Sequence, residues 1–179
     1  MNICVFCGSA TGNIPVYADA AGELGRLFAH SKHSLIYGGG NVGLMGILAD
    51  AVLSYGGEVV GVIPNFLIQR EVGHRGVTRL EIVESMHMRK KRMADLSDAF
   101  VAMPGGWGTL DELAEILTWR QLGLIQQPIG LLNINKFFDP LLDQMRTMVS
   151  EGFLRSGNLE LLLVESSPSA LLDRICSSV

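Results

Sequence analysis

Short apolar runs alternate with longer helical segments along almost the whole chain. The short runs are rich in β-branched residues and apolar at successive positions, which is typical of parallel strands covered on both faces. Their alternation with helices predicts a doubly wound α/β fold, Rossmann-like, with a mainly parallel sheet and helices on both faces. Strands are predicted at residues 2–6, 34–37, 58–63, 80–83, 99–103, 129–133 and 161–164. Helices are predicted at residues 16–31, 44–55, 86–96, 110–122, 140–150 and 169–177.

Length and composition fit a single α/β domain over residues 1–179. The chain is 48% hydrophobic and 18% charged, with a net charge of −4. This balance argues against nucleic acid or an anionic membrane as a partner, because both need a basic surface. Three cysteines do not make a disulfide framework, and no apolar run approaches the length of a membrane span. We therefore expect a cytoplasmic protein.

Glycine is concentrated where strands are predicted to end. It accounts for 21 of the 179 residues, and 18 of these lie at or before Gly123. The first strand ends in Cys7-Gly8-Ser9, the second in Gly38–Gly46 and the fifth in Pro104–Thr109. The last two loops run directly into helices, whose free amides and dipoles attract anions. Because ligands of doubly wound sheets bind beyond the carboxyl ends of the strands, these loops predict a phosphate site.

The sequence around the glycines excludes some classes of phosphate ligand. Gly38-x-Gly40-x-x-Gly43 matches the dinucleotide pattern, but it follows the second strand, and no acidic residue ends the next one. NAD is therefore disfavoured, and no P-loop motif is present. A mononucleotide or a sugar phosphate fits better. Nothing in the sequence predicts a cofactor or a metal, since His30 and His33 have no third ligand of a suitable type nearby.

Two interpretations fit Glu112. Thr109 and Glu112 have the spacing of a capping box, in which the Thr side chain caps a helix and the Glu reaches back to it. Alternatively, a carboxylate in the first turn beside a phosphate-binding loop could activate water or stabilise a positive centre on a sugar ring. Spacing alone favours the capping box.

The basic run from Arg89 to Arg92 follows the fourth predicted strand. Four consecutive helical residues point in all directions around the helix, so they do not all serve one ligand. The run either forms a solvated face, or Arg89, which is nearest the helix start, faces the loops and holds phosphate. The neighbouring His87 is interpreted as a polar surface residue.

Four stretches together resemble the LONELY GUY (LOG) family, over nearly the whole chain. Pro104–Glu112 is similar to the PGGxGTxxE signature of that family, and Met86-His87-Met88-Arg89-Lys90 to its MHxRK segment. The stretches Tyr37–Gly46 and Val5–Ser9 also match. LOG proteins are phosphoribohydrolases, formerly labelled lysine decarboxylases. They cleave cytokinin riboside 5′-monophosphates, and often AMP, into free base and ribose 5-phosphate.

The resemblance implies the same hydrolysis by a homodimer, without a cofactor. It implies Arg89 and Glu112 as the catalytic pair and reverses the preference for a capping box. Trp107 fills the variable position of the signature, where it would affect base preference. The substrate-binding residues implied by the motifs and the glycine loops are Gly38, Gly39, Gly40, Gly43, Glu71, Lys90, Gly105, Gly106, Trp107, Gly108, Thr109, Leu110, Asp111 and Thr118.

Several alternatives stay open at this point. Glu112 fits either a general base or a nucleophile, and Arg89 fits contacts with phosphate, with ribose hydroxyls or with the departing base. The substrate is either AMP or a prenylated adenine nucleotide. A non-catalytic carrier of a nucleotide or of the molybdenum cofactor is the second hypothesis, because such carriers have a related fold. A pyridoxal-phosphate lysine decarboxylase is a third and weaker one.

Overall fold

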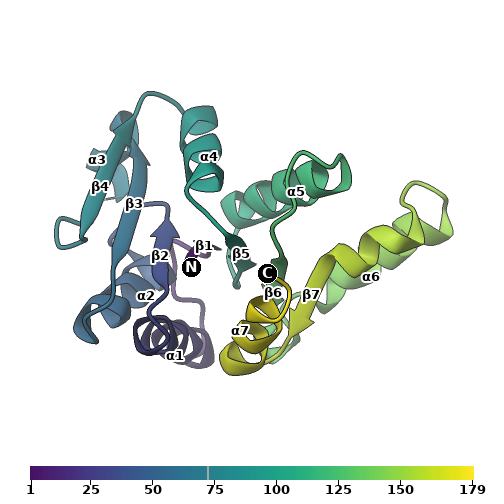
Figure 1. Cartoon of the computed structure of the whole chain (residues 1–179), viewed down its shortest axis with the longest axis horizontal. Helices are drawn as coiled ribbons and strands as arrows, with labels where there is room; N and C mark the ends of the chain where they lie inside the picture. The colour runs from purple at the N-terminus through teal and green to yellow at the C-terminus, as the bar shows by residue number, and fades with distance from the viewer. Residues whose placement is uncertain (72) are drawn as a thin grey trace.

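Seven parallel strands form one sheet at the centre of the protein. The computed structural model describes residues 1–71 and 73–179, without the side chains of residues 69–71. The strand order is β4-β3-β2-β1-β5-β6-β7 (Figure 1). The strands are β1 (Asn2–Phe6), β2 (Ser34–Tyr37), β3 (Val59–Pro64), β4 (Arg79–Val83), β5 (Ala99–Ala102), β6 (Ile129–Leu132) and β7 (Leu162–Glu165). Each bound lies within one residue of the sequence-based prediction, and the doubly wound parallel fold is confirmed.

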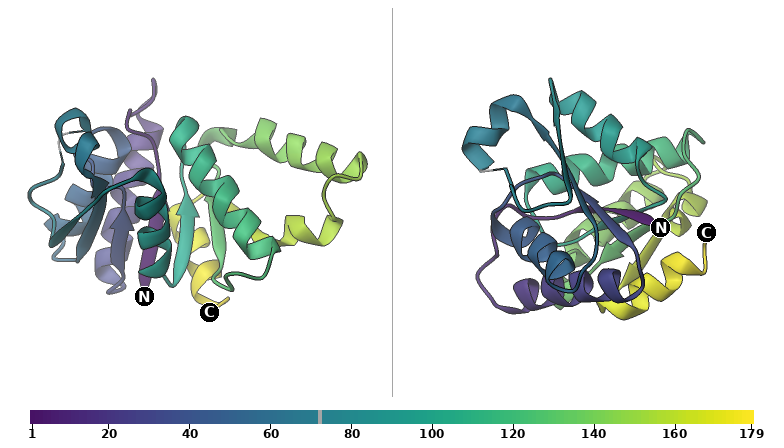
Figure 2. Two further views of the ribbon diagram at one scale, coloured as in Figure 1. Left: turned by 90° about the horizontal axis from the view of Figure 1, so that it is seen from above. Right: turned by 60° about the vertical axis from the view of Figure 1, so that its left-hand side comes forward.

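Helices cover both faces of the sheet. On one face lie α1 (Val16–His30), α2 (Gly43–Ser54) and α7 (Pro168–Cys176), and on the other lie α4 (Met86–Asp95), α5 (Trp107–Gln121) and α6 (Asp139–Ser150) (Figure 1). Buried side chains accordingly form two apolar clusters, one on each side of the strands. Figure 2 shows that α6 and the turn after it extend away from the sheet. Among the described residues, no helix has the length and apolar character needed to cross a membrane.

Some features of the fold differ from the sequence-based expectations. The strand β4 is at the edge of the sheet, and Ile82 is exposed, so this strand is not covered on both faces as expected. The helix α3 (Asn65–Glu71) and the 3₁₀ helices Ile134–Lys136 and Ser156–Leu161 were not predicted. They are short, and α3 follows β3 without a linking loop, so no separate apolar period marks it.

The central strand β1 marks the point where the winding of the sheet reverses. The chain runs outward from β1 to β4 and then crosses to β5, on the other side of β1. The loops after β1, β2 and β5 therefore meet at the carboxyl edge. Their contact is direct: the amide of Gly8 donates to Pro104 O at 3.1 Å, and the amide of Leu44 donates to Gly8 O at 3.0 Å. The expected convergence of the glycine-bearing strand ends is thus observed.

Candidate active site

A cavity of about 150 Å³ lies where these loops meet. It contains Arg89 from α4 and Glu112 from α5, the two residues that the sequence resemblance implies as the catalytic pair. The other described residues that line it come from β1 and the loop after it, from the loop after β2 and from the starts of α2 and α5. They are Val5, Phe6, Cys7, Gly8, Ser9, Gly38, Met45, Gly106, Trp107, Gly108 and Thr109.

Arg89 is held in the cavity by main-chain carbonyls. Its side chain is buried, with the residue 6% exposed. Nε donates to Val62 O at 3.1 Å, and Nη2 donates to Gly38 O at 2.9 Å, so β3 and the loop after β2 orient the guanidinium plane. Nη1 lies 3.8 Å from Met86 Sδ. The interpretation in which Arg89 faces the loops is confirmed.

The other cations of the basic run form ion pairs at the protein surface. Lys91 pairs with Asp95 on its own helix, and Arg92 pairs with Glu81 of β4 at 2.7 Å. The exposed His87 is not among the described residues that line the cavity, in keeping with its interpretation as a surface residue.

The lack of a side chain at Gly38 makes room for the guanidinium of Arg89. A Cβ atom at this position would overlap Nη2 of Arg89. The φ angle of Gly38 is not in the left-handed region, so the absence of a side chain, rather than an unusual backbone, is what this position requires. Gly38 also lines the cavity, so its expected contact with the substrate stays a prediction, to which the structure adds its contact with the arginine.

The start of α5 shows that the capping-box interpretation of Glu112 is wrong. The helix begins at Trp107, three residues earlier than predicted, with Gly106 at the N-cap and no side-chain cap. Thr109 is therefore inside the first turn, and Glu112 is in the second turn, beyond the reach of a cap. Glu112 is buried, at 8% exposure, and lines the cavity.

The N-terminus of α5 supplies the positive end of a helix to the same cavity. The first amides of a helix have no intrahelical acceptor and favour anions. Gly106, Trp107, Gly108 and Thr109 all line the cavity at this end. Gly105 packs behind them, because a Cβ there would overlap Thr109 Oγ1. The helix start thus lies where the sequence predicts a phosphate site, and phosphate binding there stays a prediction.

The pKa values of two buried cysteines, Cys4 in β1 and Cys7 just after it, are raised in this environment. Burial raises the pKa of the Cys7 thiol, and the negative charge of Glu112 raises it further. Burial and Glu112 also raise the pKa of Cys4, partly offset by a hydrogen bond with Ser97 and by Arg89. The cavity thus combines a cation, a carboxylate and a neutral thiol. Within the described residues, no group of three or more His, Cys, Asp or Glu side chains could hold a metal ion.

Lys90, Asp111 and Thr118 lie outside the cavity. Lys90 forms ion pairs with Asp111 at 3.1 Å and with Glu115 at 3.3 Å, and so joins α4 to α5. Burial opposes its charge, but the two carboxylates raise the pKa of Lys90 overall. Thr118 is exposed, and its hydroxyl donates to Ala114 O at 2.7 Å. Leu110 packs against the apolar cluster under α5.

The other predicted site glycines of the loop after β2, namely Gly39, Gly40 and Gly43, contact neighbouring main chain. Gly43 has a φ of +59°, and a Cβ there would overlap the main chain of Ser9. Gly39 and Gly40 contact the segment after α3. Glu71 is the last residue of α3, and its side chain is outside the described residues.

Sequence reasoning missed several residues that line the cavity. Cys7 and Ser9 are at the end of β1, and Met45 is in the first turn of α2. The glycine in Cys7-Gly8-Ser9 was a usable signal for the first two, because it marked this strand end as one of the converging loops. Met45 has no comparable signal, since an apolar residue at a helix start is usually part of the core.

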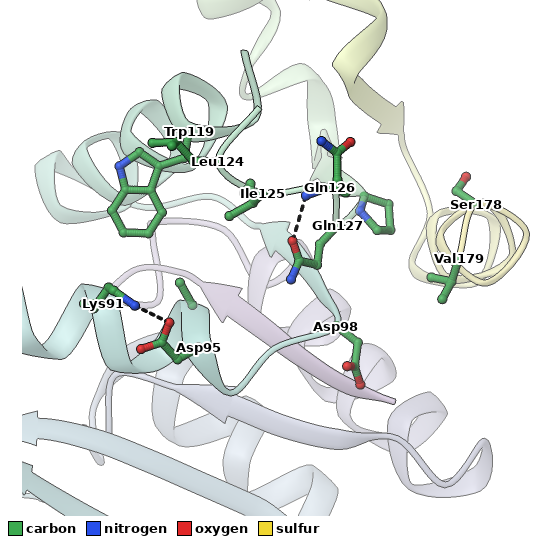
Figure 3. Close-up of a pocket in the computed structure, with 12 residues that line it drawn as sticks. Lys91, Asp95, Asp98, Trp119, Leu124, Ile125, Gln126, Gln127, Ser178 and Val179 are labelled. Carbon is green, nitrogen blue, oxygen red and sulfur yellow. Dashed lines mark hydrogen bonds and ion pairs between the residues drawn. The ribbon is translucent and has the colours of Figure 1, made fainter. Parts of the chain in front are cut away.

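A larger, open hollow of about 920 Å³ lies away from this cavity, near the amino ends of β5 and β6. Figure 3 shows Trp119, Leu124 and Ile125 on one side of it and the Lys91–Asp95 ion pair on α4. None of the predicted site residues is among the residues that line it. The volume of a cavity therefore does not point to the candidate site here, whereas the buried charged side chains do.

Comparison with known proteins identifies the family. A family model described as "Possible lysine decarboxylase" matches residues 45–175. The cytokinin riboside 5′-monophosphate phosphoribohydrolase LOG of Oryza sativa subsp. japonica is 47% identical over 168 residues, which are 94% of this chain and 69% of that protein. The enzyme of the same name, LOG1, of Arabidopsis thaliana is 46% identical over 94% of this chain and 78% of its own length.

Solved structures confirm the fold at lower sequence identity. The molybdenum cofactor binding protein of Rippkaea orientalis superposes with a TM-score of 0.73, at 24% identity, over 98% of this chain and 95% of that one. At this identity the likeness concerns the fold alone, whereas the sequence relatives are identical to this chain at nearly half of the aligned positions. The chain belongs to the LOG family of cytokinin riboside 5′-monophosphate phosphoribohydrolases.

Proposed function

We propose that the protein hydrolyses the N-glycosidic bond of nucleoside 5′-monophosphates, namely cytokinin riboside 5′-monophosphates, AMP or both. The products are the free base and ribose 5-phosphate. The observation that carries the proposal is the burial of Arg89 and Glu112 in one cavity beside the N-terminus of α5. The relatives named above are enzymes of this activity by name.

The phosphate is assigned to the start of α5. The amides of Gly106, Trp107 and Gly108 and the helix dipole supply a site for an anion there. Binding energy from the phosphate is remote from the bond that breaks, and it positions the ribose for reaction. This is the role that we propose for the glycine loop before α5.

Glu112 is assigned to the ribose. Cleavage of an N-glycosidic bond builds positive charge on the ring near C1′, and a buried carboxylate stabilises such charge strongly. Glu112 lies two helical turns or less from the phosphate-binding amides, on the same helix. Arg89, which donates to two main-chain carbonyls, supplies a positive charge to the same cavity.

The base is assigned to the mouth of the cavity, beside Trp107. A volume of about 150 Å³ is below the roughly 300–1,000 Å³ of most small-molecule sites, so it suits the ribose phosphate rather than the whole nucleotide. Trp107 lines the cavity and is 88% exposed, which leaves its ring available for stacking on a purine. Lys90 and Asp111, the sequence neighbours of Arg89 and Glu112, are assigned to substrate contacts there.

A carrier function is less well supported than hydrolysis. Its support is a likeness of fold to a molybdenum cofactor binding protein at 24% identity. A carrier needs tight binding only, and it does not need a buried carboxylate in the same cavity as a buried arginine. The identity of 47% to a named hydrolase therefore outweighs the likeness of fold.

Hydrolysis is expected to require the 5′-phosphate. With AMP and adenosine as parallel substrates, we expect kcat/KM to be at least about 100-fold higher for AMP, because only AMP engages the amides of α5. Adenine release is measured by chromatography. Equal rates for the two substrates would contradict the phosphate assignment. Tight binding of AMP without any adenine release would instead support the carrier.

We also propose that residues 1–179 act as one nucleotide-binding domain, in the cytoplasm, and as a homodimer. The single sheet supports the first point, and the acidic composition with few cysteines supports the second. For the dimer, the support is a group of exposed apolar residues after Thr118. Leu122 is 64% exposed and Leu124 is 68% exposed, beside the open hollow of Figure 3.

A charge at Leu124 is expected to weaken the dimer. We expect Leu124→Glu to raise the dimer dissociation constant at least about tenfold, because it would place a charge in a buried apolar contact. Analytical ultracentrifugation measures this. Phe153→Glu is the matched control: Phe153 is also apolar, is 87% exposed and follows α6, so this variant should remain dimeric. A dimer unaffected by Leu124→Glu would place the interface elsewhere.

A further inference from the structure

The segment that follows α3 is joined to the glycine loop after β2 by main-chain contacts. The amide of His74 donates to Gly39 O at 2.9 Å. Gly73 forms an isolated antiparallel bridge with Gly40. Gly39 has a φ of +78°, a conformation that residues with a side chain rarely adopt. These contacts therefore hold an otherwise permissive piece of main chain in one conformation.

The side chain of His74 fixes this segment to α2. The residue is buried, and Nε2 lies 3.0 Å from Asp50 Oδ1 of α2. Nδ1 lies 3.1 Å from the amide nitrogen of Gly76. An amide can only donate, so Nδ1 is the acceptor and the ring proton is on Nε2, which donates to Asp50. Both ring nitrogens are thus occupied by contacts that set the ring orientation.

A short path connects His74 to Arg89. Gly39, the acceptor of the His74 amide, directly follows Gly38, whose carbonyl accepts from Arg89 Nη2 at 2.9 Å. Any rotation of the peptide after Gly38 moves that carbonyl and with it the guanidinium. The other carbonyl on Arg89 belongs to Val62, in the interior of β3, and is fixed by the sheet. The Gly38 carbonyl, in a loop, is the one that needs support.

We propose that His74 is a positioning residue for Arg89. Its imidazole, held between Asp50 and Gly76, keeps the loop at Gly38–Gly40 in the conformation that orients the arginine. The inference rests on the proposed function, in which Arg89 takes part in catalysis. His74 itself touches neither the cavity nor the substrate, since it is not among the residues that line the cavity.

Loss of the imidazole is expected to lower kcat more than it changes substrate affinity. We expect His74→Ala to reduce kcat for AMP about tenfold with KM changed less than about threefold, because misplacing a catalytic group by a fraction of an ångström carries a cost of this size. His74→Gln should recover part of the lost activity, because its amide can donate to Asp50. Asp50→Ala, a change at an exposed position, should lower kcat severalfold without risk to folding.

A control separates positioning from general loss of stability. Thr78→Val removes the hydrogen bond from Val59 N to Thr78 Oγ1, 3.0 Å long, at the start of β3 and away from the cavity. This variant should keep the wild-type kcat, although its Tm should fall about as much as that of His74→Ala. Unchanged kcat in both His74→Ala and Asp50→Ala, or an equal fall in Thr78→Val, would overturn the proposal.

Amide hydrogen exchange tests the same contacts without activity. In the unliganded protein, peptides that cover residues 38–43 should exchange at least about tenfold faster in His74→Ala and Asp50→Ala than in the wild type. Exchange unchanged in both variants would also overturn the proposal. An inactive wild-type protein in the AMP assay, with faster exchange in the variants, would instead remove the hydrolase function and leave the support of the loop intact.

Discussion

Replacing Glu112 by Gln is expected to lower kcat for AMP about 1,000-fold while AMP still binds. The substitution keeps the size of the side chain and removes its charge, so the positive charge that develops at C1′ loses its counter-charge. The phosphate site at the start of α5 is unaffected, and the dissociation constant for AMP should change less than about threefold. Turnover is measured by adenine release, and binding by calorimetry.

The same substitution elsewhere serves as the control for Glu112→Gln. Glu23 is exposed on α1, on the other face of the sheet, and Glu23→Gln should retain full activity. If Glu112→Gln turned over AMP at the wild-type rate, the carboxylate would have no catalytic role, and its burial in the cavity would need a structural explanation.

Adding one methyl group at Gly38 is expected to have an effect almost as large. The Cβ of Gly38→Ala would overlap Nη2 of Arg89, so the guanidinium must shift and lose its hydrogen bond to Gly38 O. We expect kcat to fall about 100-fold, and overpacking to lower the free energy of unfolding by about 1–3 kcal/mol. Steady-state kinetics and urea denaturation measure the two effects.

A second site and a double variant identify the cause of the Gly38→Ala effect. Gly22 lies in α1 with open space around it, so Gly22→Ala should leave activity unchanged and stability equal or slightly higher. If the clash with Arg89 is the cause, Gly38→Ala should cost less stability in an Arg89→Ala background, and the two changes should not be additive. Additive effects would show that Gly38 acts independently of the arginine.

The fold could be predicted closely from the sequence because a parallel sheet covered on both faces leaves a strong pattern. Its inner strands read as short, β-branched apolar runs, and their alternation with helices leaves few topologies. The elements that escaped prediction are α3 and the 3₁₀ helices, which are too short to show a period. The exposure of β4 is a matter of strand order, which composition does not encode.

The site could be predicted in its main residues but not in their individual roles. Converging glycine loops predicted an anion site at the carboxyl edge, and the start of α5 lies there. The glycines themselves differ in what they pack against: Gly38 makes room for Arg89, whereas Gly43 makes room for Ser9. Such differences depend on which atoms approach each Cα across the sheet, and local sequence does not contain them.

Glu112 and His74 show the same limit for polar side chains. The spacing of Thr109 and Glu112 favoured a capping box until the helix was seen to begin at Trp107. His74 had no sequence signal of its own, because its partners Asp50 and Gly39 come from other elements. Long-range contacts of this kind become visible only once the chain is folded.

The most direct test of the account is the identification of the products formed by the purified wild-type protein from AMP and from isopentenyladenosine 5′-monophosphate. Free base and ribose 5-phosphate, quantified together by mass spectrometry, should appear in equal amounts from at least one of the two nucleotides. A folded protein that binds these nucleotides but releases neither product from either of them would contradict the proposed hydrolysis.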